Sequence, residues 1–420
     1  MEYLAGMDRS IHLRNYLSVS IEGGLYIGGL AFLSAETILP KMVHSLGGPT
    51  WAIALVAVLT PIGFSLPGIF ATHWIEKMRD MKPFIMIVGF FQRLPFLIAG
   101  LVLLFLGETL PKIALAVILV TPFLSGLIGG IIHTAFFELL VRIVPRDRRA
   151  SNLAIRFIIS GFIGILAGII VKLVLVQYPG TVGYGILHLI TFGLMMLSFL
   201  IFSLIREINQ SPPKKELPDF GSYLKSLPLF LKSTPYLTRF IWIRATGTGF
   251  LVMLPFLSIH MIEVTGSSES TIGLLVVAQM VGALFGNLVS GYLGDQYGSR
   301  LPLLISKGCF LVVFLSIFVT ESVIGFYLIF FLFGFAFYAD SVSSNAIMTE
   351  LAPVSRRPAY TGIVGFSSVP AFLIATAIGT LLMETTHSIF PACLVSFLSI
   401  GISMVLLLRL PEPRNLETSN

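Results

Sequence analysis

The sequence predicts an all-α membrane protein with twelve transmembrane helices in two six-helix bundles. Three observations lead to this fold class: the composition, a series of long apolar segments, and one long polar connector in the middle of the chain. Of the 420 residues, 55% are hydrophobic and only 11% are charged, whereas a soluble domain carries about 25% charged residues. The mean hydropathy of +0.92 is incompatible with a surface that faces only water.

The apolar segments are long enough to cross a bilayer. A spanning helix needs about 20 predominantly apolar residues, because its backbone polar groups have to be satisfied within the segment. The first segment is longer than the core of a signal peptide and lacks a cleavage site before Pro40, so we expect it to be retained as a helix. The segments that meet the length requirement are 16–39, 50–72, 84–106, 111–141, 151–176, 182–205, 237–262, 270–293, 301–320, 323–350, 359–384 and 387–409.

The distribution of Lys and Arg predicts the orientation, because short cytoplasmic loops are enriched in these residues. With the N-terminus in the cytoplasm, most basic residues of the loops lie inside, and Lys41, Lys112 and Lys172 lie outside. Both termini are then cytoplasmic. The net charge of +6 reflects this orientation, so we expect no nucleic-acid partner. Short loops without an external glycosylation sequon are typical of a bacterial cytoplasmic (inner) membrane, where we expect a multi-pass monomer in the lipid bilayer.

One long connector divides the predicted helices into six and six. It runs from Arg206 to Pro235 and combines prolines with bulky apolar residues and lysines. This composition is typical either of a solvated tether or of a segment that lies on the membrane surface. The predicted parts are an N-terminal bundle over 1–205, a cytoplasmic linker over 206–236, a C-terminal bundle over 237–410 and a cytoplasmic tail over 411–420.

Corresponding loops of the two halves carry a similar short sequence. In each loop a proline is followed by two arginines at the third and fourth positions, just before a predicted helix. The arginines are Arg148 and Arg149 in the first half, and Arg356 and Arg357 in the second. This match supports a parallel internal repeat about an axis normal to the membrane.

The end of the eighth predicted helix carries the most specific motif. Its sequence, Gly-Tyr-Leu-Gly-Asp-Gln-Tyr-Gly-Ser-Arg, contains Gly291, Asp295, Gly298 and Arg300. It resembles the G-x-x-x-D-x-x-G-x-R motif of the major facilitator superfamily. Gly298 allows the turn between two helices, and Asp295 is able to face a helix N-terminus or an arginine. The corresponding loop of the first half, from Thr72 to Pro83, keeps charged residues but lacks the glycines.

The resemblance covers nearly the whole chain as an architecture. The run from Glu138 to Arg149 also looks like the loop between helices 4 and 5 of many bacterial members. The resemblance implies the major facilitator fold, with two bundles that rock about a central site. It also implies a gate that closes the cytoplasmic side, formed by Gly291, Asp295, Gly298, Arg300, Arg148, Arg149, Arg356 and Arg357.

Four ionisable residues lie within the predicted spans: Glu22, Arg156, Arg244 and Asp340. Such groups are costly in a bilayer and are therefore functional hypotheses. The helices that carry them are among those that line the central cavity in the family that the sequence resembles. The four charges admit three interpretations, which are ion pairs, contacts with a substrate, and proton binding.

Asp340 is the first candidate for proton coupling, because a carboxylate in a poorly hydrated site is able to load and release a proton near neutral pH. Ser344 shares its helix face at i+4, and Ser341 shares a face with Asn345. We expect these three polar side chains, together with Arg156 and Arg244, to contact a solute.

Glu22 is the second candidate for proton coupling, and Tyr26 lies one helical turn further on. His133 is the third, because histidine titrates near neutral pH, although a histidine that only packs within the bundle is the commoner case. Gln279 is a further cavity candidate that would orient a solute by hydrogen bonds or simply join two helices.

The function that these features predict is secondary active transport of a small solute, coupled to protons or another ion. A facilitative uniporter, a drug or metabolite efflux antiporter, and a transporter-like sensor remain as alternatives. No metalloprotease or hydrolase motif is present in the sequence, so we do not expect an enzyme. We expect no cofactor and no metal site.

Overall fold

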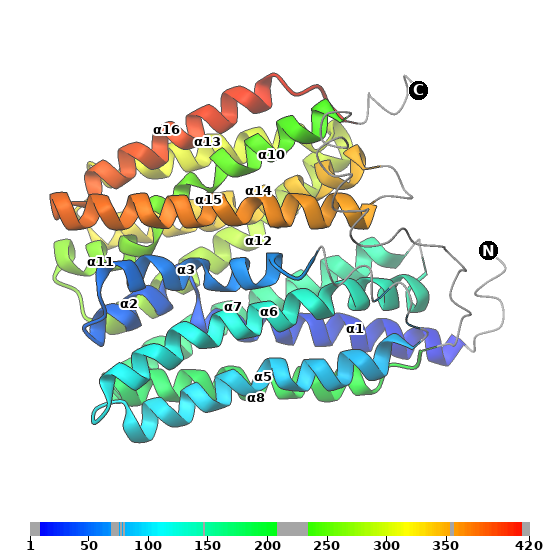
Figure 1. The fold of residues 1–420 in the computed structure, drawn as a ribbon, viewed down its shortest axis with the longest axis horizontal. Helices are drawn as coiled ribbons and strands as arrows, with labels where there is room; N and C mark the ends of the chain where they lie inside the picture. The colour runs from blue at the N-terminus through cyan, green and yellow to red at the C-terminus, as the bar shows by residue number, and fades with distance from the viewer. Residues whose placement is uncertain are drawn as a thin grey trace. The chain divides into compact units, whose positions relative to one another are not determined.

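The computed structural model describes residues 9–68, 75, 78, 80–145, 148–207, 234–352 and 357–413. Its regular elements are helices (Figure 1), and the predicted all-α membrane fold is confirmed. Among the described residues, 11 segments are long and apolar enough to cross a membrane. They are Ile11–Ser45, Met81–Leu106, Pro111–Ile143, Ser151–Gln177, Thr181–Ser203, Pro235–Thr265, Glu269–Tyr297, Arg300–Ile317, Val323–Leu351, Gly362–Thr386 and Ile389–Leu408.

The second predicted span is shorter in the described structure than the sequence suggests. Helix α3 (Thr50–Ser65) has 16 residues, and residues 69–72 of the predicted span 50–72 lie outside the described residues. Most of the predicted linker, residues 208–233, also lies outside them.

Two of the predicted spans are interrupted where the sequence suggested continuous helices. In the first, α1 (Arg9–Leu30) passes into the 3₁₀ turn η2 (Ala31–Leu33), and α2 (Ile38–Ser45) follows after a break. Pro40, expected in a connector, lies in the first turn of α2, where a proline removes no helical hydrogen bond. The seventh span consists of α10 (Pro235–Gly247), η4 (Thr248–Val252) and α11 (Leu254–Thr265). Irregular backbone within a membrane span is tolerated only where protein or water surrounds it.

The chain divides into two compact units. Unit 1 contains Met1–Ser34 and Leu59–Pro213, and unit 2 contains Ala35–Val58 and Lys214–Asn420. Segment 35–58 is assigned to unit 2 because α2 packs on α11, where Ser258 Oγ donates to the Thr37 carbonyl at 3.1 Å. The bundles expected from the sequence, 1–205 and 237–410, remain a prediction, because the compact units are defined by contacts and not by the order of the helices.

Unit 1 is built around α1, α5 (Met81–Leu106), α6 (Pro111–Ile143), α7 (Arg149–Gln177) and α8 (Thr181–Ser203). Helix α5 packs against α6 and α8, and α1 packs against α7 and α8 (Figure 1). Gly24 and Gly28 allow the close approach of α1 to α7, because a Cβ at either position would overlap Ile159 or Ile163.

Unit 2 repeats this pattern of neighbours. Its remaining helices are α12 (Ile272–Tyr297), α13 (Arg300–Ile317), α14 (Val323–Leu351), α15 (Arg357–Thr386) and α16 (Ile389–Leu408). Helix α13 packs against α14 and α16, as α5 packs against α6 and α8. The η4 turn packs against α15 and α16. The equivalent partners support the internal repeat that the arginine pairs suggested.

Candidate functional site

Glu22 and Arg156 lie side by side in unit 1. Both side chains are largely buried, with exposed fractions of 9% and 12%, and Arg156 Nη2 lies 3.8 Å from Glu22 Oε2. Ser198 Oγ is a second long contact, at 3.4 Å from Glu22 Oε1. Gly23 makes room for the guanidinium, because a Cβ there would overlap it. Among the residues that the structure describes, the Glu22 carboxylate is therefore held by long contacts.

Arg93 completes this cluster. Its Nε donates to the Met195 carbonyl at 2.8 Å, and its Nη1 donates to the Gly89 carbonyl at 2.5 Å. The guanidinium carbon lies 5.7 Å from the Tyr26 ring centre and 5.0 Å from that of Phe199. Sequence reasoning did not include Arg93 among the site residues, although an arginine in the middle of an apolar helix is itself a signal of function.

A cavity of about 130 Å³ opens beside these charges in unit 1. Tyr26 lies at its wall, where its hydroxyl accepts a hydrogen bond from Gln92 Nε2 at 2.7 Å. His133 also lines it, with its ring 4.8 Å from that of Phe64. The other walls are mostly aromatic and aliphatic side chains: Ile85, Ile132, Phe136, Phe199 and Phe202. The structure thus gathers Glu22, Tyr26, His133 and Arg156, which the sequence proposed separately.

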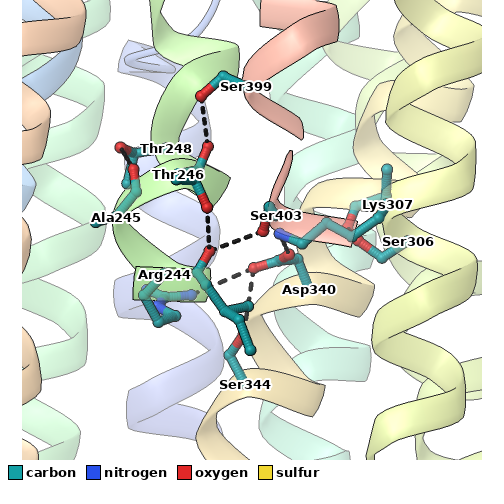
Figure 2. Close-up of polar contacts among 12 residues, drawn as sticks. Arg244, Ala245, Thr246, Thr248, Ser306, Lys307, Asp340, Ser344, Ser399 and Ser403 are labelled. Atoms are coloured by element: carbon teal, nitrogen blue, oxygen red, sulfur yellow. Dashed lines mark hydrogen bonds and ion pairs between the residues drawn. The ribbon is translucent and has the colours of Figure 1, made fainter. Parts of the chain in front are cut away.

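Unit 2 contains a second buried cluster, centred on Asp340 (Figure 2). Arg244 Nη1 lies 3.2 Å from Asp340 Oδ1, and Lys307 Nζ forms a short ion pair with Oδ2. Ser344 Oγ lies 3.4 Å from Oδ1, as the i,i+4 spacing suggested. Lys307 is 3% exposed. In unit 2 two cations therefore contact one carboxylate, whereas in unit 1 Glu22 pairs with Arg156 and Arg93 lines the same cavity.

Other cavity candidates do not join the Asp340 cluster. Ser341 and Asn345 are exposed. Gln279 is fully buried in α12, and neither of its amide atoms has a hydrogen-bond partner among the described residues. Lys307, on α13, was missed by the sequence analysis as a site residue.

The predicted gate motif lies where α12 turns into α13. Gly298 has a φ of +89°, and a Cβ there would overlap the Glu412 carboxylate, so the turn requires glycine. Arg300 donates through Nε and Nη2 to the carbonyls of Leu407 and Leu408, at 3.2 and 2.6 Å. By contrast, a Cβ at Gly291 would meet no described atom within 4 Å, so close packing there does not require this glycine.

The remaining gate candidates behave differently from one another. Arg149 donates to the carbonyls of Val144 and Val141, at 3.1 and 2.8 Å, and so satisfies the end of α6. Arg148 and Asp295 are exposed. Arg356 lies outside the described residues, as does the side chain of Arg357.

Each unit has an acidic residue just after its last helix that caps the N-terminus of its third long helix. Glu207 follows α8 and accepts hydrogen bonds from the backbone N–H groups of Met81 and Lys82, at 3.0 and 2.7 Å. Glu412 follows α16 and accepts one from the N–H of Arg300 at 3.3 Å. The sequence signal for these two caps is that one acid, Glu207 or Glu412, follows the last helix of each unit.

Comparisons with known proteins match part of the sequence to a family model and the whole fold to solved structures. Residues 245–420 match the family model described as Major Facilitator Superfamily. A structure of the nucleoside transporter NupG is 15% identical with a TM-score of 0.67, covering 94% of this chain and 98% of that one. A structure of a D-xylose–proton symporter is 12% identical with a TM-score of 0.70, covering 96% and 99%. A structure of a bacterial homologue of the iron transporter ferroportin is 16% identical with a TM-score of 0.60, covering 94% and 98%.

A comparison with curated protein sequences gives no match. The solved structures show that this chain has the fold of these membrane transporters. The resemblance to the major facilitator superfamily is thus confirmed, by the family model over residues 245–420 and by the fold over nearly the whole chain.

Proposed function

We propose that the chain is a secondary active transporter that moves a small solute by rocker-switch alternating access and couples this movement to protons. One observation carries the proposal: each compact unit buries a cluster of acidic and basic side chains inside its membrane helices. Such charges are expensive in a bilayer, and they mark solute and proton pathways.

The two carboxylates differ in how firmly their charge is held. Asp340 contacts two cations at short range, so a proton on it would leave the buried Lys307 and the partly exposed Arg244 without a counter-charge. Glu22 has contacts of 3.4 and 3.8 Å among the described residues. Protonation of Glu22 therefore sacrifices less electrostatic stabilisation than protonation of Asp340. We assign proton loading to Glu22, and we assign to Asp340 the charge balance on which a change of conformation depends.

The shared fold and the two-unit organisation support the mechanical part of the proposal. The D-xylose–proton symporter, which has this fold, is proton-coupled by name. The gate role of Asp295 and Arg300 is supported by their place at the α12–α13 turn, where Arg300 joins α13 to the end of α16. We also place the protein in a bacterial inner membrane, as a monomer with both termini in the cytoplasm.

Proteoliposomes that contain a trapped pH-sensitive dye test the proposal. Sugars, nucleosides, amino acids and organic acids are added one at a time at zero membrane potential. We expect at least one class to move protons across the membrane, and Glu22→Gln to abolish that movement. Uptake of a labelled solute without proton movement would favour a uniporter. If no class moves protons or label, the proposal of proton-coupled transport is wrong.

A further inference from the structure

The cavity in unit 1 carries an excess of positive charge. Two guanidinium groups, those of Arg93 and Arg156, line it together with one carboxylate, that of Glu22. All three side chains are largely buried, with Arg93 at 4% exposure. A buried charge without a counter-charge is unfavourable, so this cavity favours an anion over a neutral or cationic ligand.

The two arginines are not equally available to a ligand. Arg93 is anchored, because it donates to two backbone carbonyls and lies against two aromatic rings. Arg156 has a looser environment. Its ion pair with Glu22 spans 3.8 Å, which exceeds the length of a charge-assisted hydrogen bond, about 2.7–2.9 Å. The planar guanidinium of Arg156 is therefore the group with unused donors, and it suits a carboxylate.

The size and walls of the cavity indicate what the anion is attached to. Its volume of about 130 Å³ is close to the roughly 150 Å³ of an apolar protein cavity that holds benzene. Aromatic side chains dominate the walls, and Phe136 lies with its ring centre 4.8 Å from the Arg156 guanidinium carbon. An aromatic ring would stack within these walls.

We propose that the substrate is a small aromatic monocarboxylate, whose carboxylate pairs with Arg156 while its ring lies among Phe64, Phe136 and Phe199. Gln92 and the Tyr26 hydroxyl, joined by their hydrogen bond, lie at the same cavity and provide polar contacts for ring substituents. This inference rests on the proposed function, since it names the substrate class of the same site.

Binding to the purified protein tests the proposal with three ligands of one shape and different charge. The probes are benzoate, benzamide and benzylammonium, with the pair 4-hydroxyphenylacetate and its amide as larger versions. Affinity is measured by calorimetry at low ionic strength. We expect at least one carboxylate to bind about tenfold or more tightly than its amide, and benzylammonium not to bind.

Variants separate the proposed pairing from general apolar binding. Arg156→Gln should weaken carboxylate binding about tenfold or more, whereas Glu22→Gln should retain or strengthen it because a competing anion is removed. Lys112→Gln, an exposed cation of the same unit, is the control and should leave affinity unchanged. Equal affinity for the carboxylate and the amide, or no effect of Arg156→Gln, overturns the proposal, and so does a failure of both carboxylates to bind.

The outcomes also separate this inference from the proposed function. If a sugar or a nucleoside moves protons but neither carboxylate binds, the substrate class is wrong and proton-coupled transport stands. If benzoate binds through Arg156 and no solute moves protons, the site assignment stands and the transport mechanism is wrong.

Discussion

The Asp340 cluster allows a quantitative test, because its charges are unequal. Asp340 is the shared counter-charge of Arg244 and Lys307, and Lys307 is only 3% exposed. Asp340→Asn removes the negative charge and leaves the buried Lys307 and the partly exposed Arg244 without their counter-charge. Loss of one partner of a buried ion pair costs about 3–5 kcal/mol, so we expect a decrease of that size in the free energy of unfolding.

Lys307→Met should cost less, although it removes the nearest partner. Asp340 retains Arg244 at 3.2 Å, and the net charge of the cluster falls to zero, so the loss is that of one charged hydrogen bond, about 1.5–3 kcal/mol. In the double variant Lys307, the more deeply buried of the two cations stranded by Asp340→Asn, is absent. The double variant should therefore be more stable than the sum of the single effects, by about 1–3 kcal/mol.

The assay is reversible unfolding of the purified protein in mixed micelles of detergent and dodecyl sulfate, followed by circular dichroism. Glu384→Gln, which removes an exposed carboxylate of the same unit, controls for net charge and should have little effect. Strict additivity of the two single variants, or a larger loss for Lys307→Met than for Asp340→Asn, would refute this account of the cluster.

Three further predictions concern single positions. Gly298→Ala should destabilise the protein by about 1–3 kcal/mol, because φ is +89° and the Cβ would overlap Glu412. Gly294→Ala, with no described atom within 4 Å of the added Cβ, should be neutral. Equal thermal unfolding temperatures of the two variants would contradict this. Glu207→Gln should cost about 1–2 kcal/mol in the same unfolding assay by weakening the cap of α5, and Glu108→Gln at an exposed position of the same unit should not; a matching loss in both argues against the cap. Gly23→Ala should displace Arg156 and weaken benzoate binding about tenfold. Gly193→Ala, where the Cβ has open space, should leave the affinity measured by calorimetry unchanged. Unaltered benzoate binding in Gly23→Ala would count against the role of Arg156.

Much of the fold follows from the sequence because of one constraint. A backbone in lipid has to satisfy its own hydrogen bonds, so long apolar runs become helices, and their limits lie within a few residues of those expected. The interruptions at η2 and η4 were not predictable in this way. Both have apolar sequences, Ala31–Leu33 and Thr248–Val252, and their conformation depends on packing against other helices.

The site was predictable in its parts but not in its pairings. Each charge within a span was visible as a costly residue, so Glu22, Arg156, Arg244 and Asp340 were named from the sequence. Their partners depend on which helix faces lie together, and this explains why Arg93 and Lys307 were not included. The spacing of Asp340 and Ser344 was predictable because it is local to one helix.

The proposal that this chain couples solute movement to protons is tested most directly by accumulation in proteoliposomes. The solute that moves protons is supplied in labelled form, with and without an imposed pH gradient at zero membrane potential. We predict that the lumenal concentration exceeds the external one only with the gradient, and that Glu22→Gln abolishes accumulation while exchange of labelled for unlabelled solute continues. Uptake that stops at equal concentrations whatever the gradient would contradict the account.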